Sequence, residues 1–310
     1  MGMEVCGMDS NKPNLTMEPI IELIWSPEEE ELEVRSPMSG TCLEGSCSGC
    51  MGTMDDINEI VLRDLKFSYS AYVKGNSLTN KNNIDESRNS GSVQVGSENG
   101  SIVKKTIYNF NVSFTKGNIY AVVGVNGAGK STLINLIIGM YIDEYDGIIS
   151  YDNTDIRSID MISARKNLIG VAEQEPLLIS DTIRYNLDFG NDINLADCER
   201  IKNKFAEDAI SFLKILNMQD FFSERGLDYV VNENNTNLSG GEKQKISIAK
   251  ILFKNPTVMI FDEPSSAMDE GAIVQFMNYL HETKQNKIII IITHDEAVKE
   301  CCDVVVKISK

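Results

Sequence analysis

The chain has 310 residues and a formal net charge of −17, so it can bury a large core but is not expected to bind nucleic acid, which usually requires a basic surface. Its seven cysteines do not suggest a disulfide framework in a chain this long, and we expect a reducing, cytosolic setting. No stretch approaches the roughly 18 apolar residues that a membrane-spanning helix needs, and the N-terminus lacks the basic and apolar regions of a secretory signal.

Residues 1–58 are expected to form an acidic, disordered N-terminal tail. Residues 1–56 hold 12 Asp and Glu residues against 2 Lys and Arg residues. Such unbalanced charge with few aromatic residues is typical of chains that stay solvated. A short apolar patch at residues 20–25 interrupts this composition. It could dock on a partner or a membrane surface, but we favour a transient cluster within the tail.

Three cysteines of the tail could belong to a metal centre. Cys42, Cys47 and Cys50 have C-x4-C-x2-C spacing, which resembles the cluster loop of plant-type ferredoxins. A cluster needs a fourth thiolate, and the next cysteine is Cys198, far along the chain. We therefore favour exposed thiols in a glycine- and serine-rich tail, with an iron–sulfur or zinc centre as the alternative.

The folded part of the chain is expected over residues 59–310. Residues 61–69 alternate apolar and polar side chains, as a half-buried strand does. The alternation stops at residues 73–100, where 15 of 28 residues are Asn, Ser or Gly. We expect a disordered surface insertion here, since a long loop adds little closure entropy.

Three apolar runs predict a parallel sheet. Residues 119–123, 258–261 and 288–292 are apolar throughout rather than alternating. This pattern is typical of strands that are buried on both faces of a largely parallel sheet.

A helical stretch separates the first two of these runs. Between residues 181 and 225, Phe205, Ala209 and Leu213 recur at helical spacing. A helical subdomain at about residues 175–238 is therefore expected to interrupt the sheet-forming sequence.

The first apolar run leads into a glycine-rich loop. Residues 124–131 read Gly-Val-Asn-Gly-Ala-Gly-Lys-Ser, and apolar residues at helical spacing follow. This strand–loop–helix context is what a nucleotide-binding phosphate loop requires. Its backbone N–H groups and Lys130 are expected to hold phosphates, and Ser131 to ligate Mg²⁺, at a helix N-terminus whose dipole favours anions. A plain glycine turn before a helix would explain neither side chain.

Carboxylates and a histidine follow the other two apolar runs. The run 258–261 ends at Asp262 and Glu263, which suits binding of Mg²⁺ by Asp262 and activation of a water by Glu263. Two acids after a strand are a weak signal alone and a strong one behind a phosphate loop. His294 follows the run 288–292, and a single histidine is by itself more often a surface or core residue.

These motifs resemble the nucleotide-binding domain of the ATP-binding cassette (ABC) transporters. The resemblance covers residues 59–310 and includes the run Leu238-Ser239-Gly240-Gly241-Glu242, which a nucleotide on the chain's own phosphate loop does not require. The family's elements occur in its order: the phosphate loop, Gln174, the LSGGE signature, Asp262 with Glu263, the D-loop at 266–269 and His294. The resemblance implies an α/β fold: a P-loop NTPase (RecA-like) core with a mainly parallel sheet, an antiparallel β subdomain and an inserted α-helical subdomain.

The resemblance also implies roles for single residues. ATP and Mg²⁺ would be held by Tyr69 at the adenine, by Gly124, Asn126, Gly127, Ala128, Gly129, Lys130, Ser131 and Thr132 at the phosphates, and by Ser131, Gln174 and Asp262 at the metal. Glu263 would be the general base, and His294, Gln174 and Lys130 would act on the γ-phosphate. The signature residues Ser239, Gly240 and Gly241 would close over a nucleotide on a second subunit, and Asp269 would help couple the two sites.

The exporter half of the family is the closer match. The segment 171–187 and the loop 232–235 resemble multidrug and peptide exporters, and Glu233 matches an acidic residue that contacts the membrane domain in that group. Two features depart from the family: Met268 replaces a leucine of the D-loop, and the insertion separates Tyr69 unusually far from the phosphate loop. The chain ends before a glycine-containing turn that normally follows, which favours a domain of a larger transporter over a separate subunit.

The predicted function is that of an ATPase engine. Two nucleotide-binding domains, identical or different, would enclose two ATP–Mg²⁺ and drive the transmembrane domains of an exporter from the cytosolic face of a membrane. The alternatives are an ATP-gated binding switch without hydrolysis, and a soluble cassette protein of translation or DNA repair. Degenerate cassettes lose the signature, the base or the histidine, and all three are present here. Paired cassettes and long coiled coils, typical of the soluble types, are not.

Overall fold

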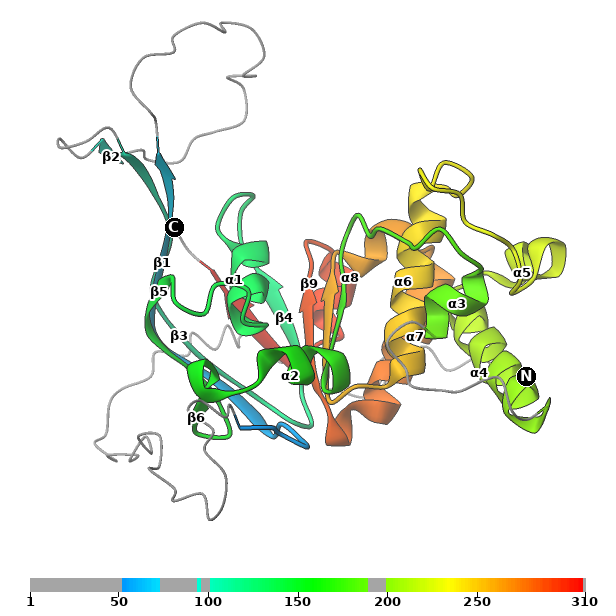
Figure 1. Cartoon of the computed structure of the whole chain (residues 1–310), viewed down its shortest axis with the longest axis horizontal. Helices are drawn as coiled ribbons and strands as arrows, with labels where there is room; N and C mark the ends of the chain where they lie inside the picture. The colour runs from blue at the N-terminus through cyan, green and yellow to red at the C-terminus, as the bar shows by residue number, and fades with distance from the viewer. Residues whose placement is uncertain (1–51, 73–93, 96–100, 189–198, 309–310) are drawn as a thin grey trace, which may run out of the picture.

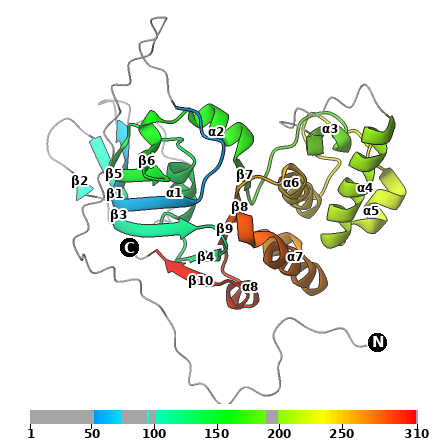
Figure 2. The ribbon, with the colours of Figure 1, turned by 90° about the horizontal axis from the view of Figure 1, so that it is seen from below.

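The computed structural model describes residues 52–72, 94–95, 101–188 and 199–308. Cys42, Cys47, Cys50 and Cys198, residues 1–51 of the predicted tail and most of the predicted insertion lie outside the described residues. The described chain forms two five-stranded sheets and a group of helices (Figure 1). The antiparallel sheet lies at one end and the parallel sheet in the middle (Figures 1 and 2). The other end holds the helices α3 Ile183–Asp188, α4 Glu199–Ile215, α5 Gln219–Arg225 and α6 Gly240–Lys254.

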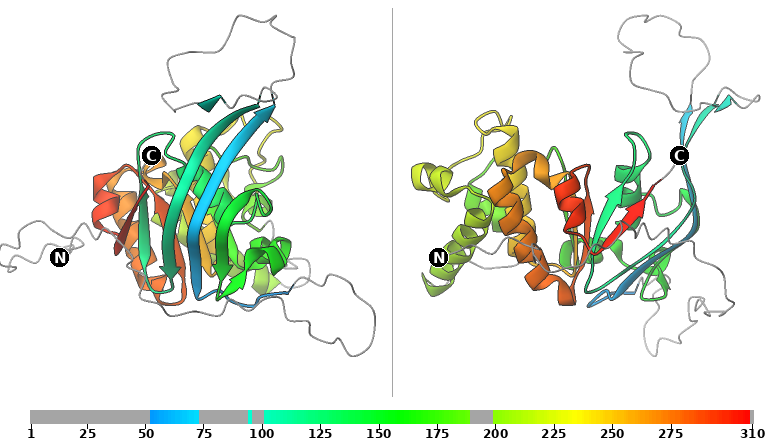
Figure 3. Two further views of the ribbon diagram at one scale, coloured as in Figure 1. Left: turned by 90° about the vertical axis from the view of Figure 1, so that its left-hand side faces the viewer. Right: turned by 180° about the vertical axis from the view of Figure 1, so that it is seen from behind.

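The antiparallel sheet has the order β2-β3-β1-β5-β6, and its curved face is seen in Figure 3. Its strands are β1 Glu59–Tyr72, β2 Gln94–Val95, β3 Ser101–Thr115, β5 Tyr145–Tyr151 and β6 Thr154–Asp155. The pairing of β1 with β3 runs from Glu59 opposite Thr115 to Tyr72 opposite Ser101. The two residues that flank the predicted insertion are therefore paired in a hairpin, and the length of the insertion does not displace Tyr69.

The second sheet is parallel and has the order β10-β4-β9-β8-β7. Its strands are β4 Ile119–Val123, β7 Ile169–Ala172, β8 Val258–Asp262, β9 Ile288–Ile292 and β10 Val304–Lys307. All five residues of β9 are buried. Ile288, Ile290 and Ile292 pack into one core and Ile289 and Ile291 into the other, because successive side chains of a strand point to opposite faces. The prediction of a doubly buried parallel sheet is confirmed.

The first core lies between the two sheets. It contains the apolar side chains of α1 Lys130–Ile137 and α2 Met161–Asn167, together with the inner face of the antiparallel sheet. Leu133, Leu136 and Ile137 of α1 are almost fully buried there. The helix that follows the phosphate loop is thus fixed by packing on both sides.

The second core joins the opposite face of the parallel sheet to helices. These are α3 Ile183–Asp188, α4 Glu199–Ile215, α5 Gln219–Arg225, α6 Gly240–Lys254, α7 Glu270–Thr283 and α8 Glu296–Glu300. Three short 3-10 helices complete the described elements: η1 Ile156–Ser158, η2 Pro264–Ala267 and η3 Lys284–Asn286. The predicted helical stripe of α4 is present, with Phe205, Ala209 and Leu213 buried against the second core.

Residues 52–58 pack on the folded domain, ahead of the boundary expected at residue 59. Ile57 is fully buried in the first core. The carboxylate of Asp56 forms an ion pair with Lys116 and accepts a hydrogen bond from Thr257 Oγ1 at 3.0 Å. The acidic composition of residues 55 and 56 suggested a solvated chain, but both the charge of Asp56 and the apolar Ile57 have partners in distant parts of the sequence.

Candidate nucleotide-binding site

The parallel sheet brings the predicted motifs to one edge. Strands β4, β8 and β9 are neighbours, with Val122 and Asp262 both opposite Ile292. The segments that leave their carboxyl ends are the phosphate loop, the two carboxylates and His294. Ligands of parallel α/β sheets bind outside this edge.

Close approach and turning of the backbone explain glycines of the phosphate loop. A Cβ on Gly124 would lie 2.7 Å from the carbonyl oxygen of Ile308, so a larger residue would push β10 away. Gly127 and Gly129 have φ of 74° and 104°, in the left-handed region that favours glycine. Helix α1 begins directly after Gly129, which points its first N–H groups toward the loop.

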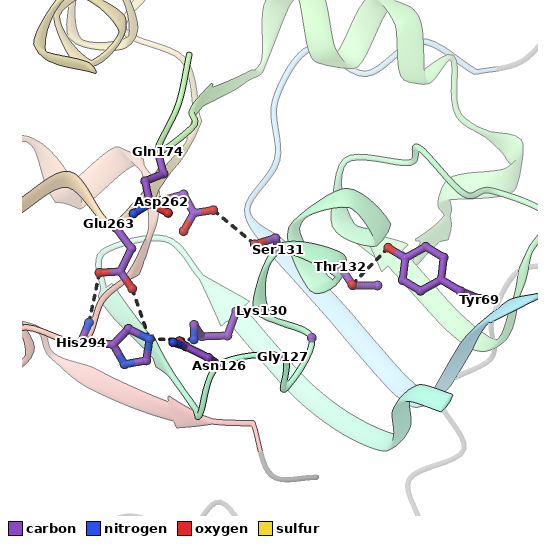
Figure 4. Close-up of a pocket in the computed structure, with 11 residues that line it drawn as sticks. Tyr69, Asn126, Gly127, Lys130, Ser131, Thr132, Gln174, Asp262, Glu263 and His294 are labelled. Carbon is purple, nitrogen blue, oxygen red and sulfur yellow. Dashed lines mark hydrogen bonds and ion pairs between the residues drawn. The ribbon is translucent and has the colours of Figure 1, made fainter. Parts of the chain in front are cut away.

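Lys130 lies between the loop and the residues that follow β8 and β9 (Figure 4). Its Nζ donates to the carbonyl oxygen of Gly124 at 2.8 Å and to Nε2 of His294 at 2.8 Å, because an ammonium can only donate. Nε2 of His294 also lies 3.4 Å from Oε1 of Glu263. Burial lowers the pKa of Lys130, and the charges of Glu263 and Asp262 oppose that shift.

Asp262 and Ser131 form an oxygen-rich pair beside the loop. The hydroxyl of Ser131 donates to Oδ2 of Asp262 at 3.4 Å. Burial, and then the neighbouring charge of Glu263, raise the pKa of Asp262, while Ser131 and Lys130 oppose the shift. Ionised Asp262 is therefore held in a surrounding that disfavours its charge.

Glu263 has an unusual backbone. Its φ and ψ are 50° and 49°, a left-handed conformation that costs a residue with a side chain about 1–2 kcal/mol. Its N–H donates to the carbonyl oxygen of Ile292 at 2.9 Å, and one of its side-chain oxygens accepts from the N–H of His294 at 3.3 Å. Strand β9 thus holds the backbone N–H of Glu263, and the chain that follows β9 holds its carboxylate.

Tyr69 lies at the opposite end of the site from Glu263 (Figure 4). Its hydroxyl is 3.2 Å from Oγ1 of Thr132, and its ring makes edge-on contacts with Phe67 and Tyr141. The side chain remains 39% exposed. An aromatic ring anchored at its edges, with surface left open, suits stacking on a planar base.

These side chains line a pocket of about 630 Å³. The lining residues are Tyr69, Asn126, Gly127, Gly129, Lys130, Ser131, Thr132, Gln174, Asp262, Glu263 and His294. Of the other predicted phosphate-site residues, Gly124 and Ala128 support the loop from within: Gly124 accepts from Lys130 through its carbonyl oxygen, and Ala128 is buried. The structure therefore brings together residues that are up to 225 positions apart.

Ser239, Gly240, Gly241 and Asp269 do not line this pocket. Ser239 caps α6 in a capping box with Glu242, and no side chain or backbone lies within 4 Å of where a Cβ of Gly240 would be. Asp269 caps α7 and accepts a hydrogen bond from Asn217 at 2.7 Å. Ser239, Gly240 and Asp269 are exposed, so the signature faces solvent rather than the chain's own pocket.

A family model described as "ABC transporter" matches residues 107–266, about half of the chain. The chain belongs to the ABC transporter family. Curated relatives agree. The chain is 32% identical over 247 residues to "ABC transporter B family member 1" of Dictyostelium discoideum, covering 80% of this chain and 23% of that protein. It is 37% identical over 186 residues to "ATP-dependent lipid A-core flippase" of Syntrophus aciditrophicus (strain SB), covering 60% of this chain and 29% of that protein.

A solved structure supports the fold of this ABC domain. "Structure of a bacterial Atm1-family ABC exporter with ATP bound" matches with a TM-score of 0.64 and 23% identity, over 87% of this chain and 40% of that chain. This chain spans less than a third of the length of the two curated relatives above. The predicted fold class and the prediction of an ATP-binding domain of the ABC transporter family are confirmed.

Three residues that contact predicted site residues of the ABC domain were missed in the sequence. Tyr141 contacts Tyr69, Asn217 holds Asp269, and Gln244 donates to the backbone behind Glu263. Only Gln244 left a signal: it lies on the same helix face as Ile248 and Leu252, four and eight residues on, where an apolar residue is expected. The other two contacts join segments that carry no common pattern.

The raised pKa of Asp262 predicts that Asp262→Asn stabilises the ABC domain in the absence of ligands. A folded-state pKa above the unfolded value of 3.8 means that the folded state binds the proton more tightly, so ionised Asp262 costs stability at neutral pH. The variant should therefore have the higher melting temperature at pH 7. Its advantage should shrink as pH falls through the raised pKa and vanish below the unfolded value. Thermal unfolding of both proteins from pH 7 to about pH 3, below the unfolded pKa, measures this. A variant that melts below the native protein at pH 7 would contradict it.

Proposed function

We propose that this chain is the ATP-hydrolysing engine of an ABC exporter and works as a pair of nucleotide-binding domains. The observation that carries the proposal is the meeting of Lys130, Ser131, Asp262, Glu263 and His294 around one pocket, while the signature lies outside it. A pocket of this kind supplies phosphate binding and a base. The exposed signature supplies what a second copy's pocket lacks.

Nucleotide binding is assigned to the two ends of the pocket. The adenine ring of ATP would stack on Tyr69, whose hydroxyl is anchored by Thr132. The phosphates would lie on the loop and at the N-terminus of α1, with Lys130 as the charged donor. Mg²⁺ would be held by Ser131, Gln174 and Asp262, which line the pocket. One carboxylate and neutral oxygens fit this ion, which takes few protein ligands and shares phosphate oxygens, and when bound it neutralises charge on the phosphates.

Hydrolysis is assigned to Glu263 as the general base. Its carboxylate would take a proton from a water whose oxygen attacks the γ-phosphorus, and the bond from that phosphorus to the bridging oxygen breaks, leaving its electron pair on ADP. His294, held by its N–H on Glu263, would orient the water and the γ-phosphate. Lys130 and, from a second subunit, Ser239, Gly240 and Gly241 would stabilise the charge that develops on the γ-phosphoryl oxygens. Asp269 would couple the two sites.

The partners are proposed as a second nucleotide-binding domain, identical or different, and the transmembrane domains of a transporter on the cytosolic side of a membrane. Within the described part of the chain, no helix has the length and apolar character needed to span a bilayer. Exposed Glu233 in the loop ahead of the signature would face the transmembrane domains. We also propose that the ATPase domain includes residues 52–58.

A dilution series tests the shared site. Turnover of ATP per chain should rise with protein concentration and level off once pairs predominate, because each pocket lacks the signature donors until a second chain supplies them. Phosphate release by the full chain at saturating ATP–Mg²⁺, followed from dilute to concentrated samples alongside light scattering, measures this. A turnover per chain that stays constant while the sample is monomeric would show that one copy suffices.

A further inference from the structure

Gln244 is a buried polar residue in the first half of helix α6. It lies on α6 with 3% of its surface exposed. Its amide Nε2 donates to the carbonyl oxygen of Glu263 at 3.0 Å and to that of Asp262 at 3.3 Å. Its Oε1 lies 2.9 Å from the hydroxyl of Ser266, which is also 2.8 Å from the carbonyl oxygen of Glu263. One side chain thus satisfies the carbonyls of both carboxylate residues.

These contacts fall at the point where the backbone is strained. Glu263 is in the left-handed region, and such a conformation persists only where the surroundings hold it. Strand β9 holds the N–H of Glu263. Gln244 and Ser266 hold its carbonyl oxygen from the other side, so together they fix the peptide that follows Glu263 and hence the direction of its carboxylate.

The same helix begins at the signature. Ser239 is the N-cap of α6, and Gln244 follows five residues later, about 7.5 Å along the axis at 1.5 Å per residue. The element that presents the signature to a second subunit therefore also carries the group that holds the base of the chain's own pocket.

We propose that Gln244 is a positioning residue for hydrolysis: from α6, with the help of Ser266, it holds the backbone of Glu263 so that the carboxylate faces the attacking water. The inference rests on the proposed function, because it needs Glu263 to be the base. Gln244 does not line the pocket, so it acts on the rate of the chemical step and not on nucleotide affinity.

The test separates the rate of hydrolysis from binding. Gln244→Met keeps the volume of the side chain but removes the amide donors. Ser266→Ala, at an exposed position, removes the hydroxyl that contacts the carbonyl oxygen of Glu263 and Oε1 of Gln244. Gln275→Met, at an exposed glutamine of α7, is the matched control. In the full chain we expect kcat to fall about 10- to 100-fold in Gln244→Met, since small misplacement of a catalytic group has effects of that size. The Kd for a fluorescent ATP analogue should change less than about twofold, because no phosphate contact is lost.

A double variant and a conservative variant decide between positioning and general damage. In the background of Glu263→Gln, Gln244→Met should lower the residual rate no further, because two residues that act as a unit are not additive. Ser266→Thr, which keeps the hydroxyl, should retain the native rate, whereas Ser266→Ala should lose about threefold or more, as expected for one lost hydrogen bond.

The outcomes distinguish this inference from the proposed function. A native chain with turnover that depends on Glu263, combined with a Gln244→Met rate equal to that of the control, would overturn the positioning role alone. So would a further, multiplicative loss in the double variant. A native chain whose turnover is unaffected by Glu263→Gln would overturn the proposed function together with the inference. If Gln244→Met melts well below the native protein, Ser266→Ala and Ser266→Thr carry the same decision.

Discussion

Replacing Glu263 by glutamine is expected to lower ATP turnover by about 10²- to 10⁴-fold, the usual contribution of a general base. A glutamine side chain has nearly the same shape, and its oxygen can still accept the hydrogen bond from the N–H of His294, which the native carboxylate accepts at 3.3 Å. It cannot take a proton at neutral pH. The loss should therefore fall on the chemical step, while Lys130, Ser131 and Tyr69 continue to bind the nucleotide.

The same variant should accumulate as an ATP-bound pair of chains. If hydrolysis normally reopens the pair, blocking the chemical step leaves the closed form as the end state. Phosphate release and size-exclusion chromatography with and without ATP–Mg²⁺ measure both effects. Glu282→Gln, at an exposed glutamate of α7, is a matched control and should behave as the native chain does. Native turnover in Glu263→Gln would remove Glu263 from the role of base.

Two inactive variants are expected to restore activity when they are mixed. Lys130→Ala removes the charged phosphate donor of a chain's own pocket. Gly241→Asp places a carboxylate on the signature, where it would repel the γ-phosphate on a second chain. The second variant should fold, because a Cβ at Gly241 would meet only Ala267, its Cβ at 3.9 Å and its carbonyl oxygen at 4.0 Å, which are ordinary contacts. Each variant alone has both composite sites impaired and should turn over ATP at least about 100-fold more slowly than the native chain.

The mixed pair contains one intact site. The phosphate loop of the Gly241→Asp chain meets the signature of the Lys130→Ala chain, and both of these are native. With random exchange half of the pairs are mixed, so an equal mixture should reach up to about a quarter of the native rate. Phosphate release before and after mixing measures this recovery. The control is Gly241→Asp alone, at the same total protein concentration as the mixture. A mixture that stays as inactive as its components would refute the composite site.

The local elements of this protein could be predicted because their signals lie in consecutive residues. The loop 124–131 carries its glycines, Lys130 and Ser131 side by side, and the unbroken apolar run of β9 reports burial on both faces. Asp262 and Glu263, which follow an apolar run directly, predicted two carboxylates at the edge of a sheet. The predicted insertion does not interrupt the hairpin that carries Tyr69, because the residues on either side of it, Tyr72 and Ser101, pair with each other.

Contacts between distant segments could not be predicted in this way. Ile57 is fully buried in the first core although its neighbours 55 and 56 are acidic, because its side chain packs among residues that lie far away in the sequence. The hydrogen bond from Gln244 to the carbonyl oxygen of Glu263 joins a helix to the end of a strand. Its geometry follows from the packing of α6 against η2. Neither contact is indicated by the spacing of residues in the sequence.

The sequence by itself determined which chemical groups this ABC domain possesses and which segments carry them. Local backbone conformation, and the spacing at which apolar side chains recur, depend on neighbouring residues and can therefore be read from the sequence. Only the tertiary structure decided which groups meet. Lys130 reaches His294, 164 positions away, because β4 pairs with β9 in a particular register. The signature is presented outward because α6 packs its apolar face on the sheet and leaves its N-terminus in solvent. Strand order and packing are properties of the whole chain, and no local pattern encodes them.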